Sequence, residues 1–269
     1  MQNTEINEQD RRRDAVREFA KIGGDVVMRF FRGANASELG VEIKEEGNLV
    51  SQADLASERA ILERIRASFP EDAVLAEETA STTQAADRLW IIDPLDGTNN
   101  FAHGLPWFSV SVAYYEQGEP RHGAVLNPVS GELFFATRGG GAVCNDRKLC
   151  VSSAESIADC LVATGFYYDR GESMRATLRH IEGLFTSGVH GIRRFGCASL
   201  DMCGVAAGCY GAYFEHFLSP WDFAAGRLIV EEAGGRVTDY RGESLGTKPS
   251  SIVVTNGPLH DEMLRRLAS

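Results

Sequence analysis

The chain has 269 residues, of which 43% are hydrophobic, so it can bury a sizeable core in one large domain or two closely packed halves. Its 38 acidic and 27 basic residues give a formal net charge of −11, which argues against nucleic acid or an anionic membrane as partner. The polar N-terminal segment has no apolar signal region, and no run of about 18 apolar residues occurs anywhere. We therefore expect a cytoplasmic protein.

Two amphipathic helices open the chain. Apolar residues recur at helical spacing through residues 11–31, where Gly23 and Gly24 offer a place for a bend. The next helical pattern follows Ser51, a residue type that caps helix N-termini, and continues to Phe69.

Short strands and turns follow between Val74 and Val143. The alternation in FSVSVAY and the turn NPVSG predict an antiparallel meander. Beyond Asp146 the pattern changes to strands that alternate with helices. The helices are expected near residues 174–185, 199–207, 221–235 and 258–267. We predict an α+β half, residues 1–145, and an α/β half, residues 146–269, that form one functional unit with the site between them.

Six cysteines lie in or beside apolar stretches, and none belongs to a C-x-x-C pair. Zinc ligands usually come in such close pairs, so the pattern favours structural thiols over a zinc site. These residues are Cys144, Cys150, Cys160, Cys197, Cys203 and Cys209.

The segment WIIDPLDGTNNF, residues 90–101, leads a buried-looking strand into two nearby aspartates, Asp93 and Asp96. Pro94 keeps Asp93 extended, and Gly97 permits a close backbone approach before a short helix whose free N–H groups suit an anion. Two carboxylates this close repel each other unless a cation lies between them. Magnesium binds through carboxylates, carbonyls, water and substrate phosphate, so this turn predicts a metal and phosphate site.

Other interpretations of this turn can be compared by spacing. Asp-Pro and Asp-Gly pairs are also ordinary turn chemistry. An EF-hand loop would need a glutamate at its twelfth position, where this chain has Gly104. A covalent aspartyl-phosphate phosphatase of the haloacid dehalogenase type has one residue between its two aspartates. In this chain two residues lie between Asp93 and Asp96. The glycine run at 138–142 lacks the helix and lysine of a nucleotide loop and predicts a hairpin turn.

Two further acidic spots end or begin predicted elements. VLAEET ends an apolar strand in Glu77 and Glu78, and SPWDFAAG sets Asp222 at the start of a helix. A helix N-cap is the simpler alternative to a ligand role for Asp222.

These segments resemble the inositol monophosphatases, within the wider group of lithium-sensitive, magnesium-dependent phosphatases with a fold like that of fructose-1,6-bisphosphatase. WIIDPLDGTNNF is similar to the family signature D-P-[IL]-D-G-T-x-N-F, and WDFAAGRLIVEEAGG to W-D-x-A-[AG]-G-x-x-[IL]-x-x-E-A-G-G. The resemblance extends from LVSQADLASERAI to the last helix. It implies a mixed α+β and α/β fold in α-β-α-β-α layers, a homodimer, and two or three Mg²⁺ ions per site.

The resemblance also implies roles for individual residues. The metal ligands would be the side chains of Glu77, Asp93, Asp96 and Asp222 and the carbonyl of Leu95. Glu77 and Thr98 would orient the attacking water, with Asp54 behind Thr98. The substrate would contact Asp96, Gly97, Thr98, Gly196, Cys197, Ala198, Glu215 and Asp222.

The implied activity is hydrolysis of a phosphomonoester by metal-activated water, with inositol 1-phosphate as the leading substrate. Cys197 stands where Thr or Ser is common in the family, and Gly211 where aspartate is frequent, so the substrate wall differs in detail. Histidinol phosphate, fructose 1,6-bisphosphate and 3'-phosphoadenosine phosphates are the alternatives. A regulatory scaffold associated with RNA polymerase is the non-enzymatic alternative, although every implied ligand is present in the chain.

Overall fold

The computed structural model describes residues 2–31, 42–45, 48–50, 52–79, 86–167 and 169–268, of which 2–10, 42–45 and 48–50 are described by their backbone alone. Ser51, the predicted helix cap, lies outside these residues.

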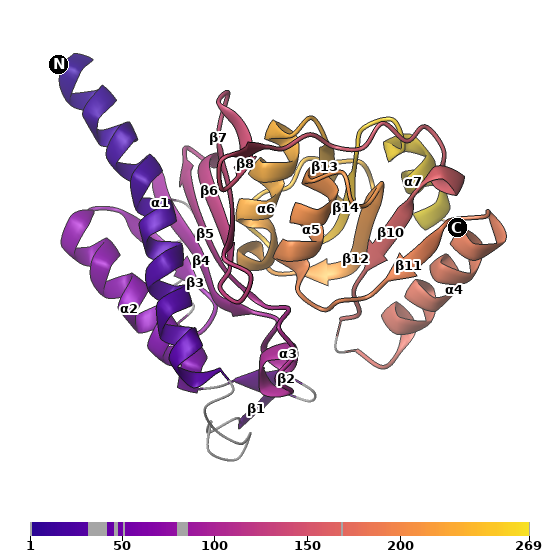
Figure 1. Cartoon of the computed structure of the whole chain (residues 1–269), viewed down its shortest axis with the longest axis horizontal. Coiled ribbons are helices and arrows are strands. Elements are labelled where there is room, and N and C mark those ends of the chain that lie inside the picture. The colour runs from indigo at the N-terminus through magenta and orange to yellow at the C-terminus, as the bar shows by residue number, and fades with distance from the viewer. Residues whose placement is uncertain are drawn as a thin grey trace.

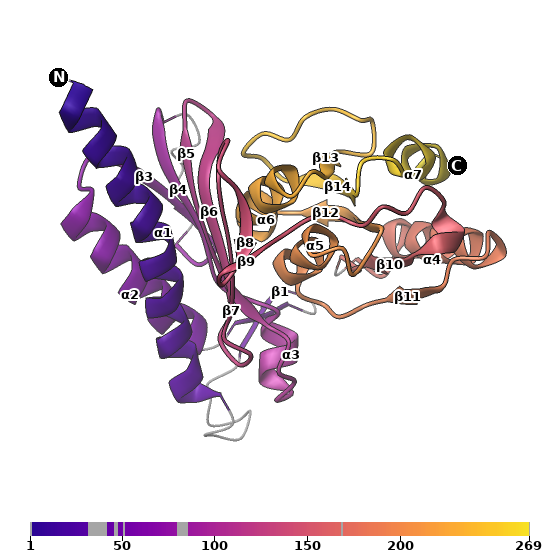
Figure 2. The same ribbon diagram turned by 45° about the horizontal axis from the view of Figure 1, so that its top comes forward.

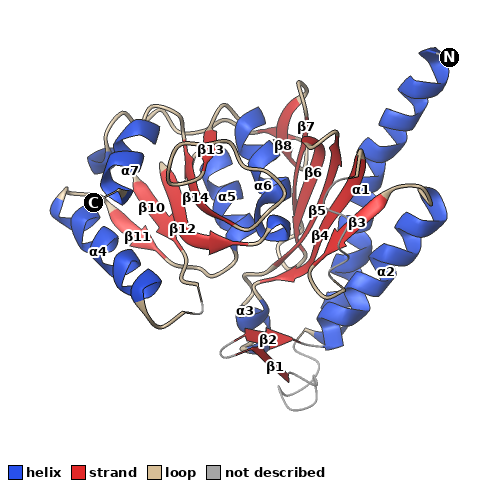
Figure 3. Ribbon diagram, turned by 180° about the vertical axis from the view of Figure 1, so that it is seen from behind, coloured by secondary structure: helices blue, strands red, loops and turns tan. Residues whose placement is uncertain are grey.

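Helices and sheets alternate in five layers. One pair of helices covers the outer face of a seven-stranded sheet, a second pair lies between this sheet and a five-stranded one, and a third pair covers the far face (Figure 1). The view from behind shows the same sequence of layers (Figure 3). The predicted α-β-α-β-α fold is confirmed. In order across the layers, the helices are α1 (Gln2–Phe30), α2 (Gln52–Ser68), α5 (Ala198–Ala206), α6 (Pro220–Glu232), α4 (Glu172–Thr186) and α7 (His260–Leu267).

The seven-stranded sheet follows chain order from β3 to β9. Strand β3 is parallel to β4, and every later neighbour is antiparallel, so the predicted meander is confirmed (Figure 2). The sheet runs past residue 145, and the division into halves at that point stays a prediction. Its strands are β3 (Ala73–Ala76), β4 (Arg88–Asp96), β5 (Ser109–Glu116), β6 (Glu119–Asn127), β7 (Glu132–Thr137), β8 (Gly141–Cys144) and β9 (Arg147–Lys148).

The five-stranded sheet has the order β11-β10-β12-β14-β13. Strand β10 is parallel to both β11 and β12, so these three strands end at the same edge, whereas β14 is antiparallel to its neighbours. Its strands are β10 (Leu161–Thr164), β11 (Gly191–Arg193), β12 (Ala212–Leu218), β13 (Arg236–Thr238) and β14 (Ser250–Thr255). Smaller elements are β1 (Glu42–Glu45), β2 (Asn48–Val50), α3 (Thr98–Ala102) and η1 (Ile157–Asp159).

Strand β4 is buried on both faces, which explains its unbroken apolar sequence. Trp90 and Ile92 belong to the core beneath α1 and α2, while Leu89 and Ile91 belong to the core between the sheets. Successive side chains of a strand point to opposite faces, so a strand between two helical layers needs apolar residues at every position. Because β4 is packed on both faces, it holds Asp93 and Asp96 at its end in fixed positions.

Helix α1 is one continuous helix through its glycine pair. A Cβ atom at Gly23 would lie 2.8 Å from Ile61 Cδ1 of α2, and one at Gly24 would lie 2.6 Å from Leu126 Cδ2 of β6. The glycines therefore permit close packing against α2 and the sheet, and they do not break the helix.

Candidate active site

A cavity of about 420 Å³ lies between the end of β4 in the first sheet and the ends of β10 and β12 in the second. Its walls come from the end of β4, the start of α3, the ends of β10 and β12, and the first turns of α5 and α6. Asp54 is absent from the lining, but the other predicted site residues all belong to it. They are Glu77, Asp93, Leu95, Asp96, Gly97, Thr98, Gly196, Cys197, Ala198, Glu215 and Asp222.

The turn after β4 is held by its own polar groups. The N–H of Leu95 donates to Asp93 Oδ1 at 3.0 Å, and the Thr98 hydroxyl donates to the Leu95 carbonyl at 3.1 Å. Gly97 has φ +92°, and a Cβ atom there would lie 3.1 Å from the carbonyl oxygen of Trp107. The left-handed backbone conformation favours glycine here, and an added Cβ would make the Trp107 carbonyl shift by a few tenths of an ångström. Helix α3 begins at Thr98 as predicted.

Asp96 accepts four hydrogen bonds from the start of α5. Its Oδ2 accepts from Ser199 N at 2.7 Å, from Ser199 Oγ at 2.6 Å and from Cys197 Sγ at 3.2 Å, while Oδ1 accepts from Ala198 N at 3.3 Å. Burial raises the pKa of Asp96, and these donors oppose that rise. Burial also raises the pKa of the Cys197 thiol well above its usual range, so the thiol keeps its proton and acts as a donor.

Asp222 lies in the first turn of α6, and Ser219 is the residue that caps the helix. Helix α6 begins at Pro220, so Asp222 is its third residue and the N-cap interpretation is wrong. The backbone N–H of Ser219 donates to Asp222 Oδ2 at 2.6 Å. Burial and the charges of Asp96 and Glu77 raise the pKa of Asp222. A Cβ atom at Gly226 would lie 2.9 Å from Met202 Sδ, which shows how closely α6 packs on α5.

One face of α2 supports the acidic turns from behind. The Ser57 hydroxyl donates to the Pro94 carbonyl at 3.0 Å, and Glu58 Oε2 accepts from Glu78 N at 2.8 Å. Asp54, Glu77 and Glu78 each place a carboxylate oxygen within 4.8 Å of the other two. In the described part of the chain, no other set of three or more His, Cys, Asp or Glu side chains gathers this closely. The sequence analysis did not select Ser57 and Glu58. They follow Asp54 by three and four residues, a spacing that places all three on one face of the predicted helix.

The opposite wall of the cavity carries two more buried acids. Glu215 on β12 accepts from the Tyr213 hydroxyl at 2.6 Å, and burial raises the pKa of its carboxyl to about 7. Asp201 of α5 is 1% exposed, and no described residue donates a hydrogen bond to its Oδ1. Burial and the charges of Asp96 and Glu215 raise the pKa of Asp201 well above its usual range. The charge of Arg194, which also lines the cavity, opposes that rise. Sequence reasoning did not select Asp201 or Arg194.

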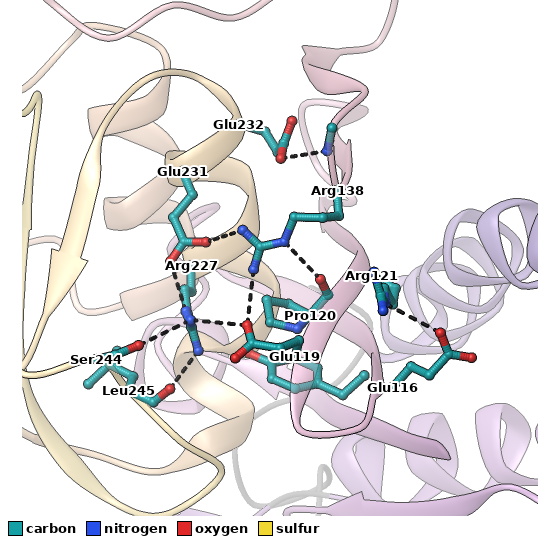
Figure 4. Close-up of polar contacts among 12 residues, drawn as sticks. Glu116, Glu119, Pro120, Arg121, Arg138, Arg227, Glu231, Glu232, Ser244 and Leu245 are labelled. Carbon is teal, nitrogen blue, oxygen red and sulfur yellow. Dashed lines mark hydrogen bonds and ion pairs between the residues drawn. The ribbon is translucent and has the colours of Figure 1, made fainter. Parts of the chain in front are cut away.

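An ionic network holds the other end of α6 against the first sheet (Figure 4). The buried Arg227 guanidinium contacts Glu231 at 2.8 Å and lies 3.7 Å from Glu119. Arg138, after β7, contacts the other oxygen of Glu231 at 2.8 Å. Glu232 accepts from the N–H groups of Gly139 and Gly141, both at 2.8 Å. Helix α6 is thus attached to the sheet at the end opposite Asp222.

The charges that line the cavity favour a cation. Six carboxylates face one guanidinium among the described lining residues. Burial and the charges of Glu77, Asp96 and Asp222 raise the pKa of Asp93 well above its usual range. Such repulsion is relieved when a divalent ion lies among the carboxylates, and the oxygen donors present are those that magnesium prefers. The residues therefore fit a magnesium ion.

This layered body with a carboxylate-lined cavity is that of a metal-dependent phosphatase, and similarity to known proteins specifies the family. The sequence pattern of the inositol monophosphatase family matches residues 8–269. The chain belongs to this family.

Individual relatives agree with this assignment. The chain is 44% identical to the inositol-1-monophosphatase of Rhizobium meliloti and 40% identical to the Nus factor SuhB of Pseudomonas aeruginosa, in each case over 88% of both chains. The solved structure of the inositol monophosphatase of Anabaena superposes with a TM-score of 0.84 at 37% identity, covering 96% of both chains. No described helix combines the length and apolar character needed to cross a membrane.

Proposed function

We propose that this phosphatase hydrolyses a small phosphorylated polyol, with inositol 1-phosphate as the leading substrate. The observation that supports the proposal is the cavity lining of six carboxylates and one guanidinium. An anionic phosphate is repelled by such a wall unless divalent cations neutralise it. The relative named inositol-1-monophosphatase supports the choice of substrate.

The metal ligands in this proposal are Glu77, Asp93, Asp96 and Asp222, with the Leu95 carbonyl as a backbone ligand. When bound, two or three magnesium ions lower the pKa of the attacking water and stabilise the departing alkoxide. The hydrogen bonds that Asp93 and Asp222 accept from backbone N–H groups hold each carboxylate in one orientation. This geometry leaves the second oxygen of each aspartate for the ion.

Glu77 and Thr98 orient the attacking water, and Asp54 supports this end of the site from α2. The backbone N–H groups of Gly97 and Thr98, where α3 begins, hold phosphoryl oxygens as charge moves in the transition state. The water oxygen bonds to phosphorus as the bond to the polyol oxygen breaks. No covalent intermediate with the enzyme is needed.

The substrate hydroxyls face the wall formed by Asp96, residues 196–198, Glu215 and Asp222. Carboxylate oxygens accept hydrogen bonds from hydroxyls, so this wall suits a polyol. The Cys197 thiol is fully buried and donates to Asp96, so Cys197 contributes through its backbone and through the orientation of that carboxylate.

Phosphate release by the purified protein with magnesium tests the proposal. The substrates are inositol 1-phosphate, histidinol phosphate, fructose 1,6-bisphosphate and 3'-phosphoadenosine 5'-phosphate, each with and without EDTA. We expect inositol 1-phosphate to give the highest kcat/KM and EDTA to abolish turnover. Preference for another substrate would overturn the substrate assignment, and turnover that survives EDTA would overturn the metal assignment.

A second function is suggested by the relative named Nus factor SuhB. In this alternative the chain binds RNA polymerase as a regulator, with or without catalysis. Pulldown of RNA polymerase by wild-type protein and by Asp93→Asn separates the two functions. Retention of the polymerase by both proteins would support the regulatory role, and its absence from both would exclude that role.

The family resemblance also implies a cytoplasmic homodimer that lithium inhibits. Sedimentation equilibrium of the full chain measures the assembly state, and lithium titration of the magnesium-dependent turnover measures inhibition. A monomer, or turnover that is insensitive to lithium, would contradict the corresponding prediction.

A further inference from the structure

Glu215, which the proposed function assigns to the substrate wall, is held by a buried tyrosine. The Tyr213 hydroxyl donates to Glu215 Oε2 at 2.6 Å, and among the described residues it is the one hydrogen-bond donor to this carboxylate. Tyr213 is 0% exposed, and Glu215 is 8% exposed. A buried carboxylate without a donor is costly, so this hydrogen bond strongly favours one orientation of the Glu215 side chain.

The alternation of side chains along β12 explains why these two residues meet. Tyr213 belongs to the core between the sheets, whereas Phe214 belongs to the core beneath α4 and α7. Side chains two positions apart in a strand lie on the same face, so Glu215 follows Tyr213 on the face toward the first sheet. The tyrosine therefore donates from within the core to a carboxylate that lines the cavity.

Gly165 lies against the same carboxylate. A Cβ atom at Gly165 would lie within 2.7 Å of both carboxylate oxygens of Glu215, so any larger residue would displace the carboxylate. Gly165 follows Thr164, whose hydroxyl donates to the Phe214 carbonyl at 2.9 Å. This bond and the parallel pairing of β10 with β12 fix the glycine beside Glu215.

The pairing of β12 with β14 changes directly after Glu215. Glu215 pairs with Ile252, and the next pair, Leu218 with Ser250, is out of register with it. Irregularities of this kind are common beside active sites, where they redirect a side chain. Glu215 is thus the last residue of the regular ladder, and its backbone is held by strands on both sides.

Two charged groups act on Glu215 without a hydrogen bond. Burial and the charge of Asp96 raise the pKa of the Glu215 carboxyl, and the charge of Arg194 opposes that rise. Charge interactions depend mainly on distance, so they fix no particular orientation of the carboxylate. The groups that set its orientation are therefore Tyr213 and Gly165.

We propose that Tyr213 and Gly165 form a clamp that positions Glu215 to accept a hydrogen bond from a hydroxyl of the leaving group. Tyr213 is a positioning residue, because it acts through Glu215 and does not itself line the cavity. The clamp makes the site selective for a hydroxylated leaving group over an alkyl group of the same ring size. This inference rests on the proposed function, because it uses the substrate wall assigned there.

Kinetics of the Tyr213→Phe variant test the clamp, because this change removes only the phenolic oxygen. The ligands are inositol 1-phosphate and cyclohexyl phosphate, which has the same six-membered ring without the hydroxyls. We expect kcat/KM for inositol 1-phosphate to fall roughly tenfold, mainly through KM, since the hydrogen bond holds a charged group. The inhibition constant of cyclohexyl phosphate against inositol 1-phosphate should stay unchanged. Equal weakening of both ligands, or no change for inositol 1-phosphate, would overturn the inference.

Tyr115→Phe is the matched control. It also removes one buried hydroxyl, which donates to the Ala224 carbonyl at 3.3 Å, and Tyr115 does not line the cavity. Its kinetics with inositol 1-phosphate should match those of wild type. The same loss in this control as in Tyr213→Phe would show a general effect of core hydroxyls and would overturn the clamp.

A double-mutant cycle shows whether Tyr213 acts through Glu215. Glu215→Gln should raise KM for inositol 1-phosphate, and addition of Tyr213→Phe should cause no further loss. Gly165→Ala should also raise KM, whereas Gly246→Ala should not, since no atom lies within 4 Å of its added Cβ. Full additivity of Tyr213→Phe and Glu215→Gln, or unchanged kinetics in Gly165→Ala, would contradict the clamp.

If the wild-type protein releases no phosphate from inositol 1-phosphate, the proposed function fails. Calorimetry of inositol 1-phosphate binding in the presence of magnesium then tests the clamp alone. Affinity that falls roughly tenfold in Tyr213→Phe and stays unchanged in Tyr115→Phe would support the clamp. Binding that is absent, or that is equal in wild type and both variants, would overturn it.

Discussion

The Arg138 guanidinium lies 2.8 Å from Glu231 Oε2 and joins the turn after β7 to the last turn of α6 (Figure 4). Arg227 contacts the other carboxylate oxygen of the same glutamate at 2.8 Å and also donates to the Leu245 carbonyl at 2.5 Å. One carboxylate therefore bridges two arginines from different parts of the chain. Because α6 carries Asp222 in its first turn, this network stabilises the helix on which a proposed metal ligand lies.

Replacement of Arg227 by methionine should lower the free energy of unfolding by about 3 kcal/mol, because it leaves Glu231 partly buried with one partner fewer. Urea unfolding measures this change. Arg175→Met is the control: its ion pair with Glu172 is exposed on both sides, and such pairs contribute less than about 1 kcal/mol. Equal losses in the two variants would contradict the importance of the buried network.

Replacement of Asp93 by asparagine should abolish turnover and leave the fold intact, because it removes a proposed ligand but keeps the size of the side chain. Asp93 lies among the charges of Glu77, Asp96 and Asp222, so the metal-free variant should unfold at a higher temperature than metal-free wild type. Magnesium should raise the unfolding temperature of wild type more than that of the variant. Phosphate release near the wild-type rate, or an equal magnesium response, would refute the assignment.

Replacement of Gly97 by alanine should reduce stability by about 2 kcal/mol and reduce activity at least tenfold, because φ is +92° and the added Cβ meets the Trp107 carbonyl. Gly118→Ala separates these causes, since Gly118 has φ +79° with no atom within 4 Å of the added Cβ. That control should lose only about 1 kcal/mol and keep its activity. Unfolding and phosphate release measure both effects, and equal behaviour would show that crowding at Gly97 is unimportant.

Stability should fall as pH falls from about 6.5 to 4, because of buried His260. Its ring nitrogens lie 2.9 Å from the Thr238 hydroxyl and 3.0 Å from the Thr255 hydroxyl. Burial, reinforced by Arg236 and opposed by Asp261, lowers the pKa of His260 from 6.5 to about 4. The unfolded chain therefore binds the extra proton first on acidification, and about 3 kcal/mol of stability should be lost across this range.

Unfolding free energies of wild type and His260→Gln at pH 4.5 and 7 measure the contribution of His260. The variant should be less stable than wild type at pH 7 but should lose less on acidification. An equal loss in both proteins would assign the acid sensitivity to other groups.

Much of the fold was predictable because its signals are local. Helical spacing in α2 and α4, alternation in β5 and turn residues between β6 and β7 each lie within a few neighbouring positions. The role of Gly23 and Gly24 was not predictable, because the atoms that approach them belong to Ile61 and Leu126, in other elements.

The sequence by itself determined the acidic turn: Pro94 and Gly97 set the backbone, and Asp93, Asp96 and Thr98 supply the polar atoms within a few residues. Only the tertiary structure decided which distant groups meet this turn, including the Ser199 donors to Asp96 and the support from Ser57. Backbone preferences act between neighbours in the chain, whereas these contacts depend on how helices and sheets pack, which no short segment encodes.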